Sequence, residues 1–131
     1  MKLVTFTHTG STRVGVVVEE GVIDLAVAAP DLPREMSAFL AAGSGAIEKA
    51  RSVSGPVLPL RSVTLEAPIL RPPKFLAIGL NYADHVAETG RDRPEHPIFF
   101  NKQSTCVSGP YGPIHAPVSY THLTLPTNRE V

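Results

Sequence analysis

Residues 74–90 read KFLAIGLNYADHVAETG, and this stretch decides how the second half of the chain folds. Residues 74–78 predict a buried strand, because four of the five are apolar and short apolar runs bounded by turn residues are typical of sheet interiors. Gly79 permits a sharp turn, and Asn81 is suited to cap a following helix. Residues 83–89 predict that helix, with about two turns. The stretch therefore predicts a strand, a turn and a short helix.

Two titratable residues on the predicted helix are the best candidates for chemistry. His85 and Glu88 stand three positions apart, so their side chains lie on one face of the helix and can touch. A carboxylate beside an imidazole fixes its tautomer and stabilises its protonated form, which makes the histidine a better general base. The spacing is not that of an HExxH zinc motif. On spacing alone, such a pair is more often a solvated surface contact, so both interpretations stay open.

The first part of the chain predicts a small β-meander followed by helices. Polar and apolar residues alternate over residues 3–7, and β-branched residues cluster over residues 14–18. Residues 22–25 provide the return strand, and turn residues lie between the three segments. Met36, Phe39 and Leu40 then form an apolar helical stripe with Asp31 as a plausible cap, and residues 44–51 predict a second helix. The predicted fold class is α+β.

Proline, glycine and serine suggest where the chain divides. Residues 52–59 are typical of a linker, which places a boundary near Leu60. The predicted organisation is an N-terminal subdomain over residues 1–60, the start of a β-rich domain over 61–117, and a tail over 118–131.

Composition narrows the classes of function. The 131 residues include 12 Lys and Arg and 12 Asp and Glu, so the formal net charge is zero. A neutral chain lacks the electrostatic footprint of a nucleic-acid or anionic-membrane binder. No apolar run approaches the roughly 20 residues of a membrane span. Cys106 alone cannot form an intrachain disulfide. The first ten residues lack a secretory signal, so we expect a cytoplasmic location.

Residues 72–90, with their GLNYADHxxE core, resemble the signature of the fumarylacetoacetate hydrolase family. Residues 94–102 resemble the family's next conserved block, and residues 108–114 resemble the loop and strand after it. Residues 3–25 are similar to the small N-terminal region of bacterial members. The resemblance implies that the second domain is the first part of a rolled, mixed β-structure that is usually dimeric.

The resemblance also implies an activity. Members cleave C–C bonds in β-diketo acids, decarboxylate or isomerise related oxo acids, or hydrate 2-oxoalkenoates, often in the catabolism of aromatic compounds. They need a divalent metal, usually Mg²⁺ and otherwise Mn²⁺ or Ca²⁺, that chelates the oxo acid. The family's His-Glu pair falls on His85 and Glu88. The lysine of the second block falls on Lys102, either near the substrate's charge or as a solvated surface residue.

The end of the chain departs from the family pattern. Members hold the metal with a Glu-x-Glu pair just after the segment that ends here at Pro117, and residues 118–131 contain no such pair. No metal ligand is therefore assigned in this chain, which we expect to be an inactive N-terminal fragment with exposed apolar residues. From Ser119 onward the sequence resembles a translated sequencing adapter; the alternative is a genuine divergent strand.

A second class of function stays open. The chain could instead be a non-catalytic, β-rich binding or interaction module that keeps the scaffold without the metal centre. A reading frame that continues past Pro117 into a Glu-x-Glu strand would favour the enzyme, whereas a native stop codon after Val131 would favour the module.

Overall fold

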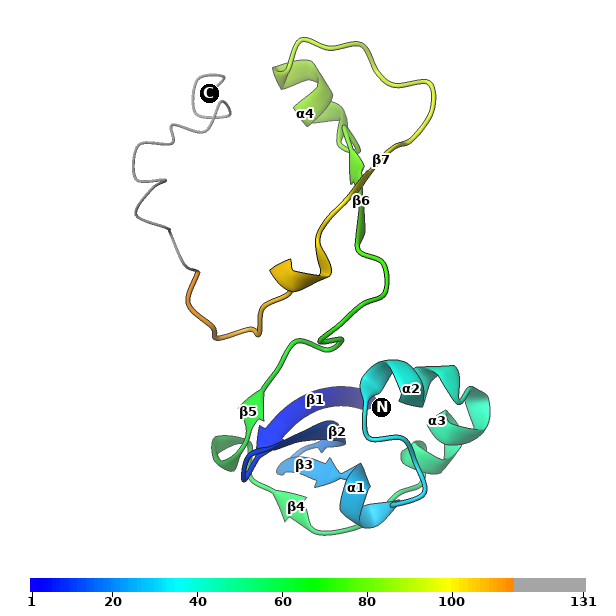
Figure 1. Cartoon of the computed structure of the whole chain (residues 1–131), viewed down its shortest axis with the longest axis vertical. Coiled ribbons are helices and arrows are strands. Elements are labelled where there is room, and N and C mark those ends of the chain that lie inside the picture. The colour runs from blue at the N-terminus through cyan, green and yellow to red at the C-terminus, as the bar shows by residue number, and fades with distance from the viewer. Residues whose placement is uncertain (115–131) are drawn as a thin grey trace. The chain divides into compact units, whose positions relative to one another are not determined.

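The structure is a computed structural model, and it describes residues 1–114, which form two compact units (Figure 1). The first unit contains Met1–Pro72 with Val107–Gly112, and the second contains Pro73–Cys106. Strands and helices are mixed, so the predicted α+β class is confirmed. None of the helices in the described part is long and apolar enough to cross a membrane. The predicted tail over residues 118–131 lies outside the described residues.

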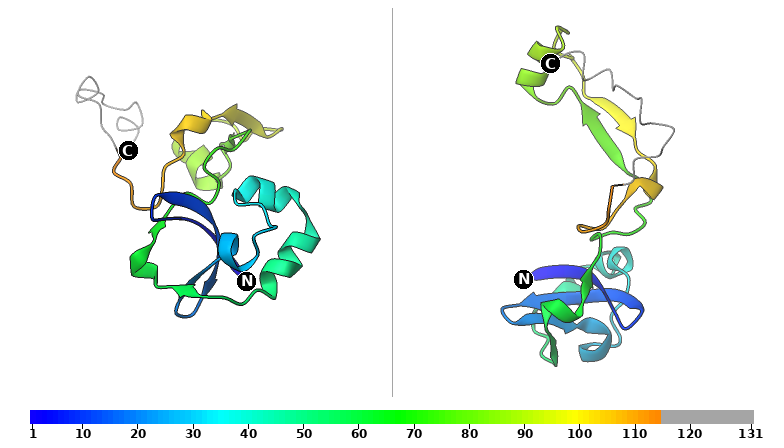
Figure 2. Two further views of the ribbon diagram at one scale, coloured as in Figure 1. Left: turned by 60° about the horizontal axis from the view of Figure 1, so that its bottom comes forward. Right: turned by 90° about the vertical axis from the view of Figure 1, so that its left-hand side faces the viewer.

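The first unit is built on a five-stranded antiparallel sheet (Figure 2). The sheet has the order β4-β3-β2-β1-β5, and its strands are β1 (Lys2–His8), β2 (Ser11–Val18), β3 (Gly21–Asp24), β4 (Val57–Leu58) and β5 (Thr64–Leu65). The first three strands form the predicted meander. Thr9 and Gly10 have φ of 49° and 75°, as a tight two-residue hairpin turn requires. The predicted return strand is one residue too long, because Leu25 begins a helix.

Three short α-helices follow the meander: α1 (Leu25–Ala28), α2 (Met36–Ala41) and α3 (Ser44–Arg51). A 3-10 turn (Leu60–Ser62) precedes β5. Met36 and Phe39 of the predicted stripe are buried against the sheet residues Val14 and Val16, whereas Leu40 is 43% exposed. Phe39 is fully buried, and burial of this apolar cluster stabilises the unit.

Thr5 departs from simple alternation along β1. The sequence pattern places its side chain on the polar face of the strand, yet only 4% of it is exposed. Thr5 lies on the face that the helices cover, because it is paired with Val14. Its hydroxyl donates a 2.7 Å hydrogen bond to the carbonyl oxygen of Pro68, which satisfies the buried polar group.

The cap of α2 is Glu35 and not the expected Asp31. The Glu35 carboxylate accepts a 2.9 Å hydrogen bond from the backbone N–H of Ala38. Backbone hydrogen bonds from Ser37 and Ala38 lower the pKa of Glu35, since they stabilise its charged form. Asp31 instead forms an exposed ion pair with Lys49.

The other face of the sheet holds a buried ion pair. Arg13 Nη2 lies 2.6 Å from Asp24 Oδ2, and the two side chains are only 11% and 6% exposed. Asp24 Oδ1 also accepts a hydrogen bond from the Ala26 N–H at the start of α1. The guanidinium carbon of Arg13 lies 5.1 Å from the centre of the Phe6 ring. Gly15 lies beside that ring, where an added Cβ would come within 2.8 Å of Phe6 Cε1.

The first unit continues to Pro72, twelve residues past the predicted boundary. It does so because β5 pairs with β1 and because Thr7 Oγ1 donates a 2.7 Å hydrogen bond to Glu66. The assignment of residues 1–60, 61–117 and 118–131 to separate functional domains stays a prediction.

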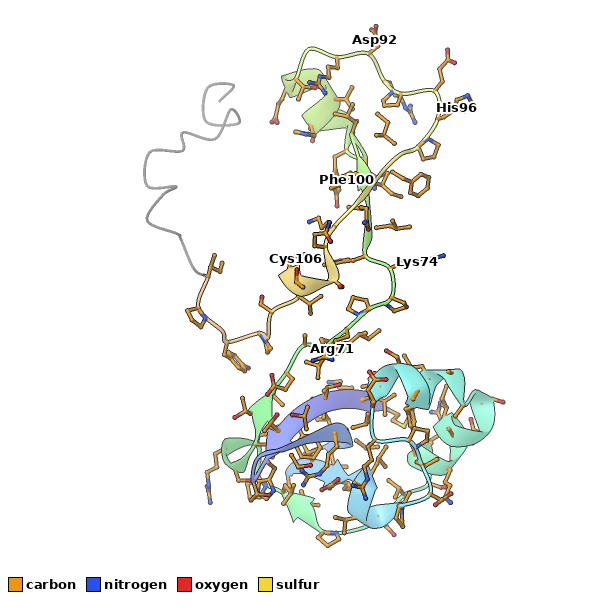
Figure 3. All side chains as sticks on the ribbon, in the orientation of Figure 1. Arg71, Lys74, Asp92, His96, Phe100 and Cys106 are labelled. Carbon is orange, nitrogen blue, oxygen red and sulfur yellow. The ribbon has the colours of Figure 1, made fainter. Side chains whose placement is uncertain are left out.

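The second unit is a two-stranded antiparallel ribbon with one helix. Strand β6 (Leu76–Gly79) pairs with β7 (Ile98–Asn101), α4 (Ala83–Glu88) connects from β6, and a 3-10 turn (Ser104–Cys106) follows β7. The ribbon exposes Leu76, Ile78, Ile98, Phe99 and Phe100 by 46–63%, and Figure 3 labels Phe100 on β7. The prediction that β6 is buried is wrong for the described residues, because β7 is its only neighbouring strand there.

Candidate active site

The turn from β6 into α4 depends on Leu80, a residue that no local sequence pattern indicated. Leu80 has a φ of 49°, a left-handed conformation that is uncommon for a residue with a side chain. Tyr82 precedes the helix without a side-chain capping bond, so the prediction that Asn81 caps α4 is wrong. Gly90, with a φ of 63°, follows the helix end.

The structure brings His85 and Glu88 together. His85 Nδ1 lies 3.8 Å from Glu88 Oε2, and the two side chains are 54% and 73% exposed. This separation is an ion-pair contact for a protonated ring, slightly longer than a hydrogen bond. Because Nδ1 faces the carboxylate, Nε2 is left to meet another molecule. The pair has the components of a general base with an orienting carboxylate.

Lys102 lies elsewhere on the same unit. Its backbone N–H donates a 2.7 Å hydrogen bond to the Phe75 carbonyl, and its ammonium group lies 5.8 Å from the centre of the Phe75 ring. The strand register pairs Asn101 with Leu76 and Ile98 with Gly79. Lys102 therefore follows the end of the ribbon opposite to the end that leads into α4, and its role in substrate binding stays a prediction.

A cavity of about 550 Å³ lies on the other side of α4 from the pair. Its apolar surface comes from both strands and the helix, and its polar surface comes from the β6–α4 turn and the loop before β7; the lining residues include Ile78, Val86, Ile98, Asn81, Arg93, Glu95 and His96. Helical geometry separates the two features, because Ala83 and Val86 line the cavity while His85 and Glu88 point away from it. The cavity is lined by residues 78–86 and 93–98, which come together only when β7 pairs with β6, so no local pattern indicates it.

The described residues do not supply a metal centre. Among them there is no group of three or more His, Cys, Asp or Glu side chains that could hold a metal ion. A divalent cation such as Mg²⁺ needs several oxygen ligands at once. The donor set of residues 1–114 therefore does not fit the metal that the family pattern implies.

Comparisons with known proteins identify the group to which this sequence belongs. The family model described as "Fumarylacetoacetate (FAA) hydrolase C-terminal" matches residues 74–126, which include α4. The mitochondrial oxaloacetate tautomerase Fahd2a of Rattus norvegicus is 40% identical over 124 residues, which cover 89% of this chain. Residues 74–126 therefore carry part of the domain of the fumarylacetoacetate hydrolase family. The family match extends to residue 126 and so includes part of the predicted tail.

Two solved structures share the fold. One is assigned as an HpcE protein from Mycobacterium smegmatis, with a TM-score of 0.77, 29% identity and coverage of 90% of this chain and 41% of that chain. The other is maleylpyruvate hydrolase from Sphingobium sp. SYK-6 in complex with manganese (II) ion and pyruvate, with a TM-score of 0.57, 26% identity, and 90% and 43% coverage. The chain also spans only 40% of the length of the rat relative.

The expectation of a cytoplasmic location is wrong, because similar proteins are mitochondrial. The rat tautomerase is mitochondrial, as are similar oxaloacetate tautomerases of Xenopus laevis, Bos taurus and Homo sapiens. The absence of a secretory signal in the first ten residues does not specify a compartment.

Proposed function

We propose that the complete protein is a metal-dependent enzyme of this family that acts on a 2-oxo or β-diketo acid, with His85 and Glu88 as its general base. The observation that carries this proposal is the contact between the two side chains on α4, inside the segment that the family model matches. The reaction is C–C bond hydrolysis, or a related decarboxylation, isomerisation or hydration.

The geometry of the pair supports a specific division of labour. Glu88 faces Nδ1 of His85, so Nε2 takes the proton from water or from the carbon next to the substrate's carbonyl. The charge that then forms on the imidazole is stabilised by the Glu88 carboxylate. His85 later returns the proton. Hydrogen bonds of this kind tighten when a substrate excludes water, so a 3.8 Å separation is compatible with the role.

The relatives support the substrate class, and one of them supports the need for a metal. One is an oxaloacetate tautomerase, and another was solved with manganese and pyruvate, so both names contain a 2-oxo acid and the second also contains a divalent cation. We propose Mg²⁺, or otherwise Mn²⁺ or Ca²⁺, whose bound form would polarise the substrate's carbonyl. Its ligands are not assigned to this chain. A homodimer, and a role in aromatic catabolism, belong to the same proposal.

Exchange of substrate hydrogen with solvent tests the function directly. Deprotonation next to a carbonyl exchanges C3 hydrogens for deuterium, so the complete protein with Mg²⁺ in D₂O should catalyse loss of the pyruvate methyl signal in ¹H NMR. The rate should fall to background in the Glu88→Gln, His85→Ala double variant. Absence of exchange and of turnover on oxaloacetate and acylpyruvates would favour the non-catalytic binding module.

We predict that residues 1–131 alone bind Mg²⁺ no better than an unrelated protein. The reason is the missing carboxylate cluster, because octahedral Mg²⁺ sheds its water reluctantly for fewer ligands. Isothermal titration with Mg²⁺ and Mn²⁺ measures this. A stoichiometric site tighter than about 0.1 mM would contradict the prediction. For the same reason we expect this chain alone to be inactive.

A further inference from the structure

The cavity behind α4 has the composition of a binding site for a small organic anion. Its floor is apolar and comes from Ile78, Val86 and Ile98, which belong to three different elements. Its volume of about 550 Å³ is within the range of roughly 300–1,000 Å³ that small-molecule sites occupy. Val86, at 9% exposure, is the most deeply buried part of α4. The floor would therefore accept a short hydrocarbon chain.

Side chains that can donate hydrogen bonds line this cavity, among them Arg93 and Asn81. Arg93 forms no ion pair with any carboxylate in the described residues, although Glu95 stands two positions away and also lines the cavity. The Asn81 amide, which the helix does not use as a cap, has no hydrogen bond to another described residue. A guanidinium offers five N–H donors in a planar fork that fits a carboxylate, and an amide adds two more.

We propose that this cavity binds a carboxylate with a short hydrocarbon chain, with Arg93 and Asn81 holding the carboxylate and the apolar floor contacting the chain. The site is separate from the His85–Glu88 pair, because α4 presents opposite faces to the two. It therefore does not depend on the proposed catalytic role. The Glu95 carboxylate also lines the cavity, and its negative charge weakens binding of an anion by repulsion.

Binding of hexanoate to residues 1–131, without metal, tests the proposal. Two-dimensional NMR should show saturable shifts of the Val86 and Ile98 methyl signals, with a dissociation constant on the order of 1 mM. Hexanol lacks the charge and acetate lacks the chain, so each should bind about tenfold more weakly. Hexylamine should not compete with hexanoate. Binding of hexylamine or hexanol as tight as that of hexanoate would overturn the proposal.

Variants of exposed loop residues make the test specific. Arg93→Gln should weaken hexanoate binding about tenfold, and Arg93→Lys, which keeps the charge without the fork, should give an intermediate loss. Glu95→Gln should strengthen binding by about twofold to threefold. Arg91→Gln is the matched control, because Arg91 is on the same loop but does not line the cavity. Equal losses from Arg91→Gln and Arg93→Gln would indicate a general charge effect and reject the site.

Discussion

His85→Ala in the complete protein should lower kcat on its oxo-acid substrate by about 10²–10⁴-fold, the usual contribution of a positioned general base. Glu88→Gln should lower kcat less, because it weakens the orientation of the ring and the stabilisation of its charge without removing the base. The double variant should be little slower than His85→Ala alone, since the two side chains act as one unit. Steady-state kinetics on oxaloacetate and an acylpyruvate measure these changes.

Controls separate this role from a structural one. Asp92→Asn removes a carboxylate from the loop after α4, in which Figure 3 labels Asp92 and His96, and it should leave kcat unchanged. Metal affinity should be the same in every variant, because neither member of the pair is assigned as a ligand. Activity of His85→Ala close to that of the wild type would reduce the pair to a surface contact on α4.

Asp24→Ala should destabilise the first unit by about 3–5 kcal/mol, because it leaves the guanidinium of Arg13 buried without its counter-ion. The loss includes the hydrogen bond from Asp24 to the Ala26 N–H, which caps α1 and is itself worth about 1 kcal/mol. Urea unfolding of residues 1–131, followed by circular dichroism, measures the change in the free energy of unfolding.

The exposed ion pair provides the matched control. Asp31→Ala breaks the contact with Lys49 in the same unit, but both side chains are solvated, so stability should hardly change. Arg13→Met combined with Asp24→Ala should recover part of the loss, because no unpaired charge then remains buried. A cost of less than about 1 kcal/mol for Asp24→Ala would show that water reaches Arg13.

Local patterns predicted most of the first unit. The meander follows from alternation and from turn residues such as Gly10, and α2 follows from the spacing of Met36 and Phe39. Residues 44–51 were predicted separately as a helix and form α3. Burial of Thr5 could not be predicted, because the carbonyl that accepts its hydrogen bond belongs to Pro68, 63 positions away. Partners so distant in sequence leave no trace in a local polarity pattern.

The second unit shows the same limit at the candidate site. The i, i+3 spacing of His85 and Glu88 is a property of one helix, so their contact was predictable and is present. The left-handed conformation of Leu80 was not predictable, since the sequence pattern favoured Gly79 as the turn residue. The cavity was also missed, because Arg93 reaches it only through the return of the chain into β7.

Gly15 limits how the first unit can diverge in sequence. A methyl group added there would meet Phe6 Cε1 at 2.8 Å and the Ile23 carbonyl oxygen at 2.9 Å, in addition to Val22. A backbone oxygen cannot move aside as a flexible side chain can, so even alanine would distort the ladder between β2 and β3. In a saturation library selected for soluble protein, this position should retain glycine alone, while the exposed Thr12 on the same strand tolerates many residues.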